Sequence, residues 1–94
     1  MTLRSVGRSV VLRSTRPPMT LRELPHRHAA RILRLNLDAS ETLWLRALGL
    51  AEGAAVEVLR AGLLGGPLQV RVGGHVAFAI DRAVAGAIDV EPAP

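Results

Sequence analysis

The stretch LQVRVGGHVAFAI, residues 68–80, decides the fold class, because it has the pattern of a β-hairpin. Apolar and polar residues alternate along residues 68–72, as expected of a strand with one buried face. Gly73 and Gly74 follow, and they suit a two-residue type I′ turn, whose central positions both need positive φ. The alternation then resumes along residues 76–80. The residues that this pattern places on one face are Leu68, Val70, Val72, Val76, Phe78 and Ile80.

Two further strands are predicted upstream of this hairpin. Residues 55–61 form one of them, with Val56 and Val58 facing inward. Residues 29–37 form the other, because apolar and polar residues alternate in its second half. The residues that share its apolar face are Leu33, Leu35 and Leu37.

Residues 38–48 between these strands are predicted to form the one clear helix. Asp38 or Ser40 can cap its start, because either side-chain oxygen can accept an orphan backbone N–H of the first turn. Glu41, three residues after Asp38, makes an approximate capping box. Gly49 is well placed as the left-handed residue that ends the helix.

Short elements complete the domain at both ends. Leu21 and Leu24, just before Pro25, are predicted to form a helical turn that plugs one end of the core. Residues 81–86 form a second helical turn, and residues 88–90 a last strand. Five short strands with one inserted helix are typical of a small β-barrel, closed or nearly closed, and closure hides strand edges that would invite aggregation.

Composition limits the function classes. The chain has 94 residues, enough for one small domain with a thin core. It contains neither Lys nor Cys, which excludes a P-loop, Schiff-base chemistry, disulfides and thiolate zinc sites. No uncharged apolar run approaches the roughly 18 residues needed to span a membrane, so no direct membrane insertion is expected.

The net charge of +4 lies on the first 18 residues. Residues 1–18 hold four Arg and no acid, whereas the remaining eight Arg equal the eight acidic residues. A nucleic-acid binder carries its positive charge on the folded part, so no nucleic-acid partner is expected. Pro17 and Pro18 stiffen the chain between the two parts. We therefore expect residues 1–18 to be a basic, disordered extension and residues 19–92 to be the folded domain.

Several segments together resemble the FeoA family. The helix end LRALGLAEG, residues 45–53, followed by VEV at 56–58, resembles the family signature of a Leu-Gly helix end, a turn glycine and a Val-rich strand. Residues 65–73 resemble the family's loop, Pro-Leu strand and hairpin glycine. Residues 78–90 are similar to its last strand-turn-strand, and residues 19–25 to its start.

The resemblance spans residues 19–92 and implies an SH3-like barrel. It implies a cytoplasmic, non-enzymatic accessory protein of bacterial ferrous-iron uptake, with the cytoplasmic part of the FeoB transporter as its partner. Related domains end the iron-dependent repressors of the DtxR type. The alternative is therefore a metal-binding or metal-sensing SH3-like module.

The predicted helix departs from the family, and its departures give the candidate partner-binding residues. Leu43 and Trp44 stand where family members often carry Arg, and Ala47 where they often carry Glu. A helix that is apolar nearly all round is buried on two sides or touches a partner, so Trp44 either packs on the barrel or anchors a partner. The apolar helix is also compatible with weak homo-oligomers.

A glycine-flanked loop adds two further candidates, Leu63 and Leu64. One of the two leucines is expected to cover the barrel end, and the alternative is an exposed apolar tip for docking. Arg82 is expected to face solvent.

Catalytic and metal sites are not predicted. His26 and His28 share one face of an extended segment, where they could bind a metal. A third ligand would have to be His75, Asp81 or Asp38, and no three-ligand cluster is visible in the sequence, so no metal site and no cofactor are expected. No histidine-carboxylate-nucleophile arrangement points to acyl transfer, so no catalytic residue is assigned.

Overall fold

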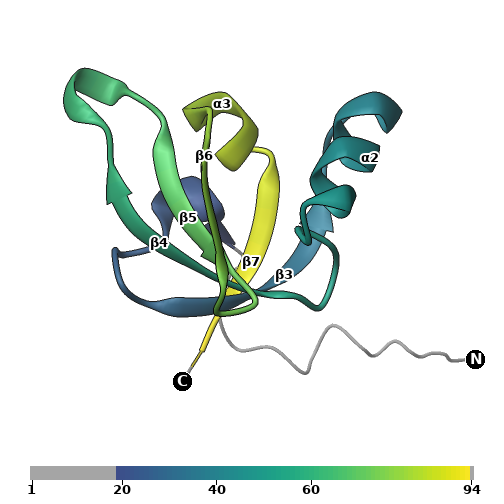
Figure 1. Ribbon diagram of the computed structural model, residues 1–94, viewed down its shortest axis with the longest axis horizontal. Helices are drawn as coiled ribbons and strands as arrows, with labels where there is room; N and C mark the ends of the chain where they lie inside the picture. Colours follow the sequence, from purple (N-terminus) through teal and green to yellow (C-terminus); the bar gives the residue numbers. More distant parts are fainter. Residues whose placement is uncertain (1–18, 94) are drawn as a thin grey trace, which may run out of the picture.

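The computed structural model describes residues 19–93, which form one curled antiparallel sheet with helical segments at its rim (Figure 1). The strand order is β2-β7-β3-β4-β5-β6. The strands are β2 (Met19–Thr20), β3 (Ala29–Leu35), β4 (Ala55–Ala61), β5 (Leu68–Val72), β6 (Val76–Ile80) and β7 (Ile88–Pro92). The helical elements are η2 (Leu21–Glu23), α2 (Ala39–Ala47), η3 (Leu63–Gly65) and α3 (Arg82–Ala85).

This architecture confirms the predicted mainly-β fold with one inserted helix. The sheet has six strands rather than five, because the two-residue strand β2 pairs with β7. Its hydrogen-bonded order begins at β2 and ends at β6, so the curled sheet is not closed by strand pairing. The predicted extension, residues 1–18, lies outside the described residues.

The hairpin of β5 and β6 follows the predicted pattern with one difference in the turn. Gly73 and Gly74 both have positive φ, at 62° and 83°. Val72, however, pairs with Val76, so the loop contains three residues, and the predicted two-residue turn is wrong. The inward face of β5 is fully buried, whereas on β6 only Ile80 is, because β6 forms an edge of the sheet.

Strand β3 departs from the predicted alternation. Its register to β7 shifts between Ile32 and Arg34, which inserts one extra residue into the strand. Ile32 and Leu35 therefore both face the core, while Leu33 is 45% exposed. The prediction that Leu33 and Leu35 share a face is wrong for this reason. The strand also ends at Leu35 rather than at residue 37.

The core is a single apolar cluster enclosed by the curled sheet. Leu21 and Leu24 are buried in it, which confirms the predicted plug at one end. No polar or charged side chain is buried among the residues that the structure describes. The remaining core residues are Ala30, Ile32, Leu35, Leu45, Leu50, Val56, Val58, Leu68, Val70, Val72, Ile80, Ala85, Ile88 and Val90.

Helix α2 is defined at both ends by local hydrogen bonds. Asp38 is the cap, since its Oδ1 accepts from the backbone N–H of Glu41 at 2.8 Å. At the other end Gly49 has a φ of 99°, and the N–H of Leu50 donates to the carbonyl of Leu45 at 2.9 Å. This 6→1 bond is that of a Schellman motif, and it turns both Leu45 and Leu50 into the core.

Removing the helix cap tests the assignment of Asp38. Asp38→Ala should lower the free energy of unfolding by about 1 kcal/mol, because an N–H of the first turn loses its acceptor. The matched control is Ser40→Ala, two residues further along the same helix. Equal losses for the two variants in urea denaturation would contradict the assignment.

Substitutions at two glycines with similar φ distinguish the cost of backbone strain from the cost of side-chain crowding. An added Cβ at Gly49 would lie 3.3 Å from Cγ1 of Val72, whereas one at Gly53, with a φ of 89°, would meet nothing within 4 Å. Gly53→Ala should therefore cost about 1 kcal/mol of left-handed strain, and Gly49→Ala about 2 kcal/mol. Urea denaturation checks the order, and a larger loss for Gly53→Ala would refute this packing.

Candidate partner-binding site

Helix α2 presents an apolar face to solvent. Leu45 is buried beneath the helix, while Leu43 on the opposite side is 71% exposed and Trp44 on the flank is 58% exposed. Ala47 lies one turn after Leu43 and is also exposed. We call Leu43, Trp44 and Ala47 the helix face. Of the two predictions for Trp44, packing on the barrel is wrong, because most of the side chain is accessible.

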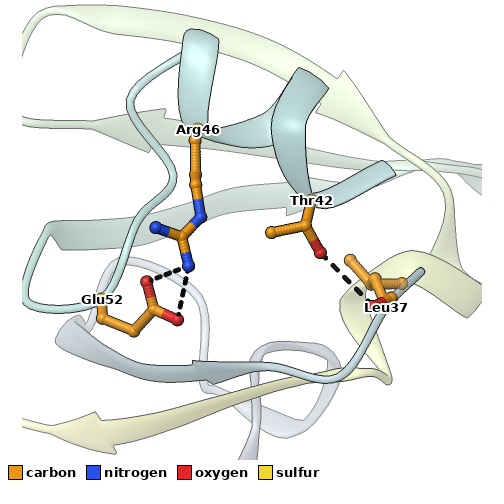
Figure 2. Close-up of polar contacts among 4 residues, drawn as sticks. All are labelled: Leu37, Thr42, Arg46 and Glu52. Atoms are coloured by element: carbon orange, nitrogen blue, oxygen red, sulfur yellow. Dashed lines mark hydrogen bonds and ion pairs between the residues drawn. The ribbon is translucent and has the colours of Figure 1, made fainter. Parts of the chain in front are cut away.

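Polar contacts tie the helix to the chain on either side of it (Figure 2). Nη2 of Arg46 lies 2.9 Å from Oε1 and 3.0 Å from Oε2 of Glu52, in the segment that leads to β4. Oγ1 of Thr42 donates to the carbonyl of Leu37 at 3.4 Å. An exposed ion pair contributes about 0–1 kcal/mol, so these contacts orient α2 more than they stabilise it. The burial of Leu45, with these contacts in addition, keeps the helix face turned away from the sheet.

The loop between β4 and β5 exposes both of its leucines. Leu63 is 91% exposed and Leu64 fully so, and both lie in the short η3 turn. The prediction that one leucine covers the barrel end is therefore wrong. We call Leu63 and Leu64 the loop tip.

Backbone geometry, rather than side-chain packing, holds the loop tip. The N–H of Gly62 donates to the carbonyl of Pro67 at 2.8 Å. A Cβ at Gly62 would come within 3.0 Å of that same oxygen, so only glycine allows the loop to close this tightly. Leu64 has a φ of 54°, a left-handed conformation that costs a leucine about 1–2 kcal/mol. The fold thus keeps an exposed leucine in a strained conformation.

Arg82 also helps to hold the β4–β5 loop, a role that the sequence did not predict. Its Nε donates to the carbonyl of Gly65 at 3.1 Å and so links α3 to the residue that follows the loop tip. Arg82 is half-buried rather than directed into solvent as predicted. Sequence carries little signal for such a contact, because the acceptor is a backbone atom 17 residues away.

The five predicted partner-binding residues lie on two separate elements, the helix face on α2 and the loop tip on η3. Figure 1 shows α2 and the β4–β5 loop extending from the same end of the molecule, on opposite sides, with α3 between them. A partner that covered this end could contact the helix face and the loop tip together.

The histidines do not form a metal centre in the part of the chain that the structure describes. Nε2 of His28 lies 3.0 Å from the carbonyl oxygen of Ala93, so this ring is engaged with the C-terminal segment. No group of three or more His, Cys, Asp or Glu side chains between residues 19 and 93 is placed to hold a metal ion. Within the same range, no helix is both long and apolar enough to cross a membrane.

Solved structures of similar fold include FeoA proteins and metal-dependent transcriptional repressors. The solution structure of FeoA from Chlorobium tepidum is 30% identical, with 81% of this chain and 71% of that chain covered and a TM-score of 0.76. The zinc-complexed FeoA of Stenotrophomonas maltophilia is 34% identical, with coverage of 78% and 89% and a TM-score of 0.64. A manganese-dependent transcriptional repressor shares the fold at 17% identity, with coverage of 85% and 44% and a TM-score of 0.73.

The Stenotrophomonas protein is described as an SH3 domain protein and as a possible activating factor of ferrous iron transport. Its similarity to this chain confirms the predicted SH3-like fold. Comparison with curated protein sequences gave no significant match. Residues 19–92 match the FeoA domain model, which covers the whole sheet and every element around it. The chain therefore belongs to the FeoA family.

Proposed function

We propose that this protein is a cytoplasmic accessory protein of bacterial ferrous-iron uptake that binds the cytoplasmic part of a FeoB-type transporter and catalyses no reaction itself. Family membership supports the link to ferrous-iron transport. The observation that carries the binding role is the helix face, where Leu43 and Trp44 are mostly exposed on a helix that buries only Leu45. A helix that leaves such side chains in water is suited to contact a protein partner.

The energetics favour use of both patches. Burying the exposed parts of Leu43 and Trp44 would contribute about 3 kcal/mol. A micromolar complex requires a net binding free energy of about 8 kcal/mol, and the contacts must also offset the entropy lost on association. The loop tip, Leu63 and Leu64, offers a comparable apolar area at the same end of the molecule. We therefore infer that the transporter contacts both patches.

Binding would regulate transport by shifting a conformational equilibrium. A bound protein changes the balance between two transporter conformations only as far as it binds one more tightly than the other. A rigid apolar surface can do this if its complement on the transporter is formed in one conformation and not in the other.

Substitutions on the helix face test the binding role. Leu43→Ala should weaken binding of the full chain to the purified cytoplasmic portion of the transporter about tenfold, and Trp44→Ala by more, because buried apolar area is lost. Leu33→Ala is the matched control, since Leu33 is a partly exposed leucine on β3. Isothermal titration calorimetry measures the affinities. Unchanged binding by Trp44→Ala, or an equal loss for Leu33→Ala, would exclude the helix face as the contact.

The loop tip allows a test in which stability and binding respond differently. Leu64→Gly should change the free energy of unfolding by no more than about 1 kcal/mol from the wild-type value. Relief of left-handed strain offsets the flexibility that glycine adds to the unfolded chain. The same variant should weaken transporter binding about tenfold. Calorimetry and urea denaturation give the two values. Full affinity in both Leu64→Gly and Leu63→Ala would remove the loop tip from the proposed site.

A further inference from the structure

Strand β6 is an unprotected edge of the sheet. It pairs with β5 on one side, and no backbone hydrogen bond joins its other side to another strand within residues 19–93. Alternate residues of such an edge direct both N–H and C=O outward. Edges are usually protected by charged residues, prolines or bulges. The sequence VAFAI of β6 has no charge and no proline, and its register to β5 is regular.

The residue pattern of β6 is symmetrical about Phe78. If two copies of the strand lay antiparallel with Phe78 opposite Phe78, Val76 would face Ile80, and Ala77 would face Ala79. Large side chains would then meet large ones on the core side, and small would meet small on the other. Even-numbered residues face even-numbered ones and odd-numbered residues face odd-numbered ones. The residues whose backbone groups point outward in one copy therefore face those that point outward in the other.

The polar residues that flank β6 fit the same alignment. Continuing it by one residue at each end places His75 of one copy opposite Asp81 of the other, twice in the pair. Both residues are exposed. Asp81 has extended backbone angles, with φ −63° and ψ 146°, and its side chain makes no capping hydrogen bond to α3. Its carboxylate is therefore available to a group across the edge.

We propose that β6 pairs with β6 of a second copy of this chain, forming a two-fold dimer in which the two six-stranded sheets become one. Any extended peptide could satisfy the backbone groups of the edge. A second copy also matches the side-chain sizes and places an imidazole opposite a carboxylate at both ends, which is the self-complementarity that a two-fold interface requires. Val76, now 49% exposed, and the half-buried Phe78 would be covered. The dimer uses neither the helix face nor the loop tip, so it is independent of the proposed function.

Charge exchange tests the dimer in the full chain by sedimentation velocity. The wild type should show a concentration-dependent dimer. His75→Asp places Asp opposite Asp81, and Asp81→Arg places Arg opposite His75, so each should raise the dissociation constant about tenfold. An equimolar mixture of the two variants should recover dimers of wild-type affinity, because both ends then pair an acid with a base. His26→Asp is the control, since it makes the same substitution at an exposed histidine that does not flank β6.

Hydrogen exchange provides a second readout that needs no variant. Alternate amides of β6 should exchange more slowly as the wild-type concentration rises through the dimer dissociation constant. A wild type that stays monomeric up to millimolar concentration would overturn the proposal. So would an equal effect of His26→Asp, no recovery in the mixture, or a dimer abolished by Trp44→Ala and unaffected by His75→Asp, which would indicate association through the helix face instead.

Discussion

The turn at Gly49 determines which side of helix α2 faces the core and which side faces solvent. Its positive φ allows Leu45 and Leu50 to enter the core from opposite sides of the helix end. Leu45 is the one residue that α2 buries, so this turn fixes the rotation of the helix. Leu43 and Trp44 must then face solvent. In a chain whose core is this small, one glycine thus separates the residues that stabilise the fold from those available to a partner.

Sequence periodicity predicted much of this fold, because most strands bury one face in a simple alternation. Residues 55–61 and 68–72 behave as their patterns indicate. Leu33 does not follow its pattern, because β3 has one extra residue where it pairs with β7. Strand β7 lies about 55 residues further along the chain, so the local sequence of β3 cannot predict that register. Strand β2 was missed because two residues are too few to show a period.

The candidate site was predicted in part. Departures from the family pattern at Leu43, Trp44 and Ala47 identified a face that the structure leaves exposed. The loop tip was misjudged, because alternation reveals neither the left-handed conformation of Leu64 nor the exposure of both leucines. The contribution of Arg82 depends on a backbone acceptor and leaves no pattern in the sequence.

The most direct test of the central claim, that the helix face is a protein-binding surface, uses Trp44 itself. The chain contains one Trp, so incorporation of 5-fluorotryptophan gives a single ¹⁹F resonance that reports on this side chain alone. On titration with the unlabelled cytoplasmic portion of the transporter, the resonance should shift and lose its sensitivity to exchange of H₂O for D₂O, as Trp44 becomes buried. Formation of the complex with an unchanged, solvent-sensitive resonance would contradict the claim.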